Sequence, residues 1–190
     1  TLYYGLYSEK SLVSIITLVD QGLNYFGICA GSNLAVNTFT YGLTKFNEIG
    51  CHYPSGKTDP TMFTLNLLAA NTKGPNYENT SENGRAVPIF YNSDIHSLFW
   101  NKGHALEIHN GAAVRTLAHF AYLPSERLEP GAVLSQRGKA RIAISGFHPE
   151  ISSEDLNGLN SSFWNSSNPD FELIQRSEKV RVEIFKKMAD

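Results

Sequence analysis

Residues 24–33 read Asn24-Tyr25-Phe26-Gly27-Ile28-Cys29-Ala30-Gly31-Ser32-Asn33. A short apolar run ends at a cysteine, and Gly27 and Gly31 stand on either side of it. Glycines at these places suit a corner that forces unusual backbone angles and brings neighbouring backbone close together. The pattern therefore predicts a strand over residues 25–28, a sharp corner at Cys29, and a helix over residues 32–40.

Such a corner is a suitable place for a nucleophile. It exposes its central side chain above the sheet edge, and the positive N-terminal end of the following helix favours an anion there. The backbone N–H of Ala30 would also point towards the negative oxygen formed when Cys29 attacks a carbonyl carbon. We interpret Cys29 as a nucleophile, with a buried structural cysteine as the alternative.

A cysteine nucleophile needs a base, and the base needs an acceptor that orients it. Among the six histidines of the chain, His148 directly follows the strand expected over residues 141–145, so it too lies at a strand end. Pro149 stiffens the turn, and Glu150 is placed to accept an imidazole N–H and fix the tautomer. Taken alone, His148 could be a turn residue and Glu150 a charge at a helix start. The two segments together favour the catalytic interpretation.

Both segments resemble signatures of a known superfamily. Gly27-Ile28-Cys29-Ala30-Gly31 and Phe147-His148-Pro149-Glu150 are similar to the two signatures of class I glutamine amidotransferase domains, whose triad is Cys–His–Glu. More closely, the chain resembles the amidotransferase-like N-terminal domain of eukaryotic-type biotin–protein ligases. The likeness runs over residues 22–151 and includes residues 74–77, 81–87, 109–112, 137–141 and 145–150.

The resemblance implies a fold and a set of roles. The fold is α/β, a flavodoxin-like sheet with flanking helices and an antiparallel extension. Residues 1–190 form one domain, which lacks the usual N-terminal strands because too few residues precede Cys29. Cys29 is then the nucleophile, His148 the general base and acid, and Glu150 its orienting partner. Gly27, Ala30 and Gly31 form the elbow and its oxyanion donor.

The resemblance also indicates residues that bind substrate. Asn33 holds the place at which true glutamine amidotransferases usually have a glutamine. Asn110 and Gly111 would lie near the cleft and help to bind a polar substrate. Tyr77 would supply an aromatic wall, although a solvent-facing loop residue is the ordinary alternative.

Three functions follow from these residues. The first is an enzyme that hydrolyses an amide or related acyl group of a small molecule. The second is a non-catalytic binding or regulatory domain on the same scaffold, since Asn33 replaces the usual glutamine and the usual Gly-Gly loop is missing. A small cysteine peptidase fits less well, because such enzymes usually place the histidine beside the cysteine, where this chain has Ala30.

The composition is that of a globular chain. Of 190 residues, 42% are apolar and 18% are charged, and the formal net charge is −2. This balance gives no reason to expect nucleic acid or a membrane as a partner, and no apolar run reaches the roughly 20 residues of a membrane helix. Cys29 and Cys51 form no disulfide framework, so we expect a cytoplasmic location. A partner domain or a second copy of the chain remains open.

No cofactor or metal is expected. His104 and His109 lack a cluster of cysteines or carboxylates beside them, so we interpret them as surface or loop residues. Cys51 is interpreted as structural.

Hydrophobic periodicity and turn residues predict the remaining elements. Helices are expected over residues 9–21 and 171–188, and a surface loop over residues 152–170. Strands are expected over residues 62–68, 86–91, 105–108, 116–122, 132–135 and 141–145.

Overall fold

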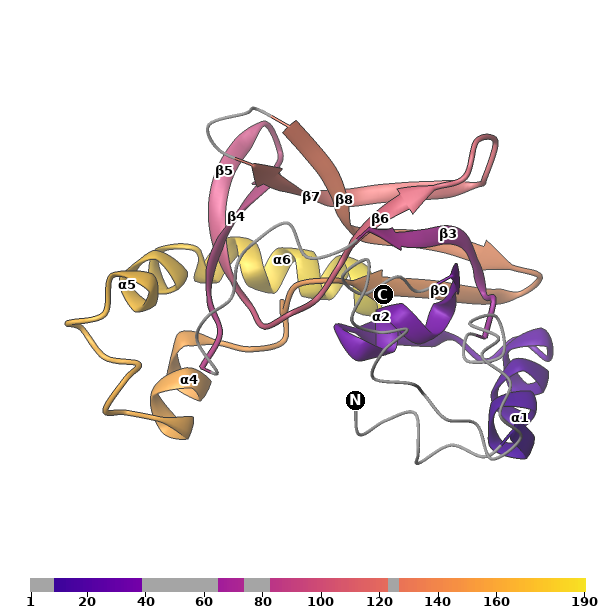
Figure 1. The fold of residues 1–190 in the computed structure, drawn as a ribbon, viewed down its shortest axis with the longest axis horizontal. Coiled ribbons are helices and arrows are strands. Elements are labelled where there is room, and N and C mark those ends of the chain that lie inside the picture. The colour runs from indigo at the N-terminus through magenta and orange to yellow at the C-terminus, as the bar shows by residue number, and fades with distance from the viewer. Residues whose placement is uncertain (1–8, 39–64, 74–82, 123–126) are drawn as a thin grey trace, which may run out of the picture.

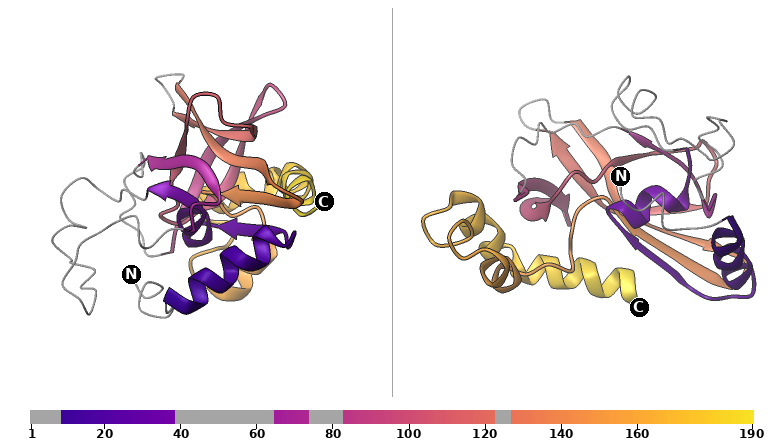
Figure 2. Two further views of the ribbon diagram at one scale, coloured as in Figure 1. Left: turned by 90° about the vertical axis from the view of Figure 1, so that its right-hand side faces the viewer. Right: turned by 60° about the horizontal axis from the view of Figure 1, so that its bottom comes forward.

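A computed structural model describes residues 9–38, 65–73, 83–122 and 127–190 of the chain (Figure 1). Tyr77 and Cys51 lie outside these residues, and so does the first part of the strand expected over residues 62–68. The expected α/β class is confirmed, because the chain folds into mixed sheets with helices on both sides (Figures 1 and 2).

The larger sheet has six strands. Their order across the sheet is β1 (Tyr25–Ile28), β9 (Ala140–Ser145), β8 (Arg127–Arg137), β7 (Val114–Tyr122), β4 (Arg85–Tyr91) and β5 (Asp94–Trp100). Strand β1 runs parallel to β9, and the other neighbouring pairs are antiparallel. The antiparallel part therefore dominates the described sheet, and a flavodoxin-like run of parallel strands is not established.

A second sheet of three strands covers part of the first. It is formed by β2 (Val36–Thr38), β3 (Leu68–Lys73) and β6 (Ala105–Ile108), with β2 parallel to β3 and β3 antiparallel to β6. Its apolar side chains share one cluster with Ile142 and Ile144 of β9 and with Val19 of the first helix. The two sheets thus enclose one part of the core.

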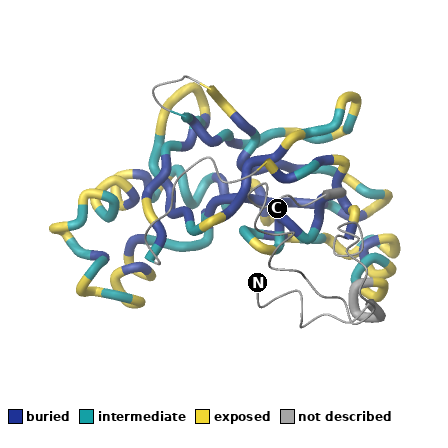
Figure 3. Tube along the Cα trace, viewed as in Figure 1, coloured by how far each residue is buried: buried dark blue, intermediate teal, exposed yellow. Residues whose placement is uncertain are grey.

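The other face of the larger sheet is covered by C-terminal helices. Neighbouring residues of β9 alternate between the two faces, because Ala143 belongs to a different cluster from Ile142 and Ile144. Ala143 shares its cluster with Ile184 and Met188 of the last helix. Figure 3 shows buried residues in the central strands, with exposed residues at the turns, on the helix surfaces and along some strand ends. This double coverage explains the near-continuous apolar run in β9.

The described helices are α1 (Glu9–Asp20), α2 (Ala30–Ala35), α4 (Ser153–Leu159), α5 (Pro169–Arg176) and α6 (Glu178–Ala189). None of them combines the length and apolar character that crossing a bilayer needs. The predictions for α1 and β1 are confirmed. The helix expected over residues 32–40 starts earlier and gives way to β2 at Val36.

The C-terminal predictions need correction. The single helix expected over residues 171–188 is two helices that meet at Ser177, whose hydroxyl accepts the Ser97 N–H at 2.9 Å and donates to Leu173. The surface loop expected over residues 152–170 contains α4. Ser152 and Asp155 form a capping box at the start of that helix, a signal that the Ser- and Asn-rich composition concealed.

The strand predictions are mostly correct, with three exceptions. Strands β2 and β5 were not expected, and the strand predicted over residues 62–68 is displaced, since residues 65–67 lie before β3. The N–H groups of Leu65 and Leu67 donate instead to the carbonyls of Leu34 and Ala35 at the end of α2. Tertiary hydrogen bonding therefore overrides the local apolar pattern.

The corner between β1 and α2 depends on one of its two glycines. A Cβ at Gly27 would lie 2.7 Å from the carbonyl oxygen of Gly31, so only glycine fits there. A Cβ at Gly31 would meet only the Tyr25 hydroxyl, at 3.9 Å. The expectation that both glycines are sterically required is therefore wrong for Gly31, whose carbonyl accepts a 2.7 Å hydrogen bond from Tyr25.

Replacing Gly27 by Ala is expected to lower the free energy of unfolding by roughly 1–3 kcal/mol, because the new methyl group overlaps a backbone carbonyl. Gly31→Ala is the matched control. It is expected to leave stability unchanged or to raise it by up to about 1 kcal/mol, since alanine is favoured over glycine in a helix. Urea unfolding followed by circular dichroism measures both changes. Equal losses for the two variants would contradict this account of the corner.

Candidate active site

Cys29 occupies a strained backbone position directly after β1. Its φ of 52° and ψ of −108° lie in a region that L side chains rarely adopt. Its N–H donates to the carbonyl of Ser145 at 2.8 Å, which extends the β1–β9 pair by one residue. Its own carbonyl accepts the Ser32 hydroxyl at 2.6 Å and the N–H groups of Ser32 and Asn33. The sheet and the helix thus hold the cysteine in the corner that the sequence predicts.

His148 lies on the turn that follows β9. Because β1 and β9 are parallel and Ile28 is paired with Ser145, both strands end at the same edge of the sheet. The Ser145 hydroxyl donates to the carbonyl of Phe147 at 2.8 Å, and the His148 N–H donates to the carbonyl of Phe99 at 2.9 Å. These contacts bring the His148 turn to the same edge as Cys29.

The imidazole of His148 interacts with both partners that the sequence suggests. Its Nδ1 lies 2.7 Å from Glu150 Oε1. Burial alone would lower the pKa of His148, but the thiol of Cys29 and the carboxylate of Glu150 outweigh burial and raise the pKa to about 9. The ring is therefore cationic at neutral pH.

The other ring nitrogen of His148, Nε2, is buried and has no hydrogen-bond partner within the part of the chain that the structure describes. Cys29 is nevertheless one of the two groups that raise the pKa of the imidazole. Contacts between catalytic groups are often long or poorly aligned until a substrate is bound.

Aromatic side chains support the imidazole from one side. The ring centroids of Phe99 and His148 are 5.4 Å apart, and Phe99 packs edge-on against Trp164 at 5.6 Å. Phe99 and Trp164 are both buried. The residues of α4 and its following loop therefore help to fix the His148 ring.

A loop that the sequence analysis did not single out contacts the thiol. Cys29 Sγ donates to the carbonyl oxygen of Asn101 at 3.4 Å. Asn101 lies between β5 and β6, and the indole N–H of Trp100 ties this loop to the carbonyl of Gly103 at 2.8 Å. A Cβ at Gly103 would come within 1.7 Å of the Gly146 carbonyl oxygen, so the loop packs directly on the His148 turn. Gly103, which follows an apolar stretch of sequence, is the residue that could have indicated the close packing of this loop.

The predicted substrate-binding residues fall in different places. Asn33 lies one turn beyond Cys29 on α2, is only 6% exposed, and its Oδ1 has no hydrogen-bond partner among the described residues. Asn110 and Gly111 form the turn after β6, at the opposite end of that strand from Asn101. Gly111 has a φ of 76°, so turn geometry accounts for the glycine. The described contacts give Asn110 and Gly111 no link to Cys29.

The histidines considered as metal ligands are separate from one another. His104 is buried just before β6, and burial lowers its pKa to about 4, whereas His109 follows the same strand. Within the described ranges, no group of three or more His, Cys, Asp or Glu side chains could hold a metal ion.

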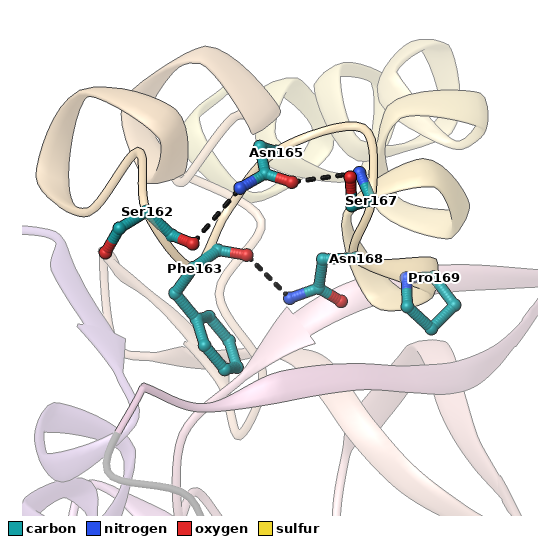
Figure 4. A pocket seen from close by; sticks show the side chains of 6 residues that line it. All are labelled: Ser162, Phe163, Asn165, Ser167, Asn168 and Pro169. Carbon is teal, nitrogen blue, oxygen red and sulfur yellow. Dashed lines mark hydrogen bonds between the residues drawn. The ribbon is translucent and has the colours of Figure 1, made fainter.

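A surface hollow of about 450 Å³ lies on the connection between α4 and α5 (Figure 4). It is lined by Ser162, Phe163, Asn165, Ser167, Asn168 and Pro169. The Asn165 and Asn168 amides are occupied within the connection, donating to backbone carbonyls that include those of Ser162 and Phe163. Neither Cys29 nor His148 lines this hollow, so it is not part of the candidate site.

No family model matches the chain, and no curated protein matches it. Among solved structures, the chain is similar to a crystal structure of a glutamine amidotransferase, with 16% sequence identity and a TM-score of 0.47. The match covers 92% of this chain and 67% of that chain. A likeness of this size carries no argument about chemistry, which has to rest on the residues of this chain.

Folding raises the pKa of His148 from its ordinary 6.5 to about 9, so the protonated ring stabilises the native state. This contribution is fully present below pH 6.5 and is lost as the pH rises through about 9. The difference in unfolding free energy between the wild type and His148→Gln is therefore expected to shrink between about pH 6 and about pH 10. Denaturant unfolding across this range measures it. A difference that stays constant or grows would contradict the raised pKa.

Proposed function

We propose that the protein is a Cys-His-Glu hydrolase of the amidotransferase-like kind, acting on an amide or related acyl group of a small molecule. The observation that carries the proposal is the conformation and setting of Cys29. Its positive φ holds the thiol at a strand-to-helix corner, beside a cationic imidazole that Glu150 fixes at 2.7 Å. Strain of this kind persists only where the surrounding structure enforces it, and it is concentrated at functional sites.

The first half of the reaction forms a thioester. The sulfur of Cys29 attacks the amide carbon, and the carbonyl oxygen becomes negative. The Ala30 N–H at the start of α2 would donate to this oxygen, a contribution of about 3–4 kcal/mol for one such donor. As the carbon–nitrogen bond breaks, His148 Nε2 gives its proton to the departing nitrogen, which leaves as ammonia or an amine.

The second half releases the acid. His148, now neutral, takes a proton from water, and the resulting hydroxide attacks the thioester carbon. The carbon–sulfur bond breaks, the product leaves as a carboxylic acid, and Cys29 and His148 return to their starting states. Glu150 accepts the Nδ1–H and holds the ring in one orientation.

Substrate recognition is part of the same proposal. Asn33 is buried beside the corner with an amide oxygen that lacks a partner in the described structure, so it is suited to accept an N–H from a polar substrate. The proposal includes two further points. The chain is related to the N-terminal domains of biotin–protein ligases, and its scaffold is flavodoxin-like. Both points are supported by the quoted sequence stretches and by the parallel β1–β9 pair.

One observation favours a non-catalytic binding domain as the alternative. The carbonyl oxygen of Asn101 lies 3.4 Å from Cys29 Sγ. A carbonyl oxygen so close to the nucleophile would repel the negative oxygen of a tetrahedral intermediate unless the two point in different directions. In this alternative the thiol lines a pocket and no bond is broken.

Iodoacetamide is expected to label Cys29 faster than Cys51, because a neighbouring imidazole activates a cysteine nucleophile. His148→Ala is expected to slow labelling of Cys29 by about tenfold or more and to leave Cys51 unchanged as an internal reference. Peptide mass spectrometry of timed samples measures both rates. Equal rates at the two cysteines, or no effect of His148→Ala, would count against a thiol–imidazole pair.

The wild-type protein is expected to release ammonia or an amine from members of a panel of small amides, glutamine and asparagine included, and Cys29→Ala is expected to abolish the release. A coupled ammonia assay and amine derivatisation measure turnover. Cys29→Ser serves as a control for folding, since it preserves the size of the side chain. If no amide is cleaved, the non-catalytic alternative is favoured.

A further inference from the structure

We propose that Glu178 and Arg181 on α6 form a positioning brace for the turn that carries His148 and Glu150. This inference rests on the proposed function of that turn, but the brace itself is defined by contacts that do not depend on turnover. Neither residue was singled out by the sequence, in which they are ordinary charges on an expected C-terminal helix.

The first contact of the brace is to the peptide between the two active-site side chains. Arg181 Nη1 donates to the carbonyl oxygen of Pro149 at 2.8 Å. Pro149 stands between His148 and Glu150, so this carbonyl lies at the centre of the turn. Holding it restricts the rotation of the peptide that links the imidazole to its orienting carboxylate.

The second contact is made by Glu178. Its Oε2 accepts Arg181 Nε at 2.5 Å, one helical turn away, and its Oε1 accepts the N–H of Ser153 at 2.7 Å. The segment from Pro149 to Ser153 is therefore attached at both ends to a single turn of α6. Because α6 itself is anchored in the core through Ile184, the turn is tied to a rigid element.

Burial distinguishes this pair from an ordinary surface salt bridge. The side chain of Arg181 is 13% exposed. The comparable pair on α5, Glu172 and Arg176, has side chains that are 57% and 69% exposed, and among the described residues their side chains bond only to each other. Exposed pairs of that kind contribute little to stability. The largely covered side chain of Arg181, by contrast, also donates to the backbone carbonyl of Pro149.

The brace acts on the His148–Glu150 contact. That contact is 2.7 Å long and is one of the causes of the raised pKa of His148. Pro149 and Glu150 are neighbours, so loss of the Arg181 contact frees the carboxylate to move away from Nδ1. Arg181 is thus a positioning residue, because it acts through Glu150 rather than by touching substrate.

The test compares Arg181→Met with Arg176→Met in the full chain. Methionine keeps an apolar stem and removes the charge and the donors. We expect Arg181→Met to move the His148 titration, followed by NMR of the imidazole, from about 9 towards 6.5. We also expect alkylation of Cys29 by iodoacetamide at neutral pH to slow about tenfold, as misplacement of a catalytic group does. Arg176→Met is expected to change neither.

Two further variants keep the inference open to contradiction. Arg181→Lys retains a cation and one donor and is expected to restore part of the His148 titration. Glu178→Gln is expected to give a smaller shift in the same direction, because its amide can still accept one N–H. These variants also serve if Arg181→Met proves too unstable to study.

The outcomes separate this inference from the proposed function. If Arg181→Met leaves the His148 titration unchanged while Cys29→Ala abolishes amide release, the brace is wrong and the hydrolase stands. If Arg181→Met shifts the titration but the wild type cleaves no amide, the brace stands and the hydrolase is wrong. An equal shift from Arg176→Met would show a general effect of lost charge and would overturn the brace.

Discussion

The structure depends on the parallel pairing of β1 with β9. This register sets Ile28 opposite Ser145 and lets the Cys29 N–H donate to the Ser145 carbonyl, so two segments far apart in the chain end at one sheet edge. The carboxyl ends of parallel strands are where α/β proteins usually collect their functional groups. A shift of this register by one residue would turn Ile142 and Ile144 out of the core between the sheets, so packing and site geometry are specified together.

The imidazole of His148, the thiol of Cys29 and the carboxylate of Glu150 meet at this edge. The imidazole of His148 is held cationic against its burial by the thiol on one side and a carboxylate on the other. The Asn101 carbonyl accepts the thiol, and the loop that carries it is packed against the turn after β9. The corner at Cys29, the loop at Asn101 and the turn at His148 thus meet at one edge of the sheet.

The sequence predicts the parts of this arrangement that local chemistry determines. The strand at Tyr25, the corner at Cys29 and the proximity of His148 to Glu150 all follow from residue type and spacing. The features that the sequence did not predict depend on contacts between segments that lie far apart in the chain. Asn101 reaches the thiol because Gly103 packs on Gly146. The C-terminal helix is divided at Ser177, whose hydroxyl accepts the N–H of Ser97 in β5. Asn110 and Gly111 were assigned by analogy alone, and nothing local indicated whether the turn after β6 would reach Cys29.

The break at Ser177 has one more effect, on how the protein behaves among its own copies. Strand β5 forms one border of the larger sheet, and a border strand offers unpaired amide groups to any passing extended chain. The N–H of Ser97 in β5 donates to the Ser177 hydroxyl, and α5 lies alongside β4 and β5. The interruption that divides the C-terminal helix thus shields this margin from intermolecular strand pairing, a common route to aggregation.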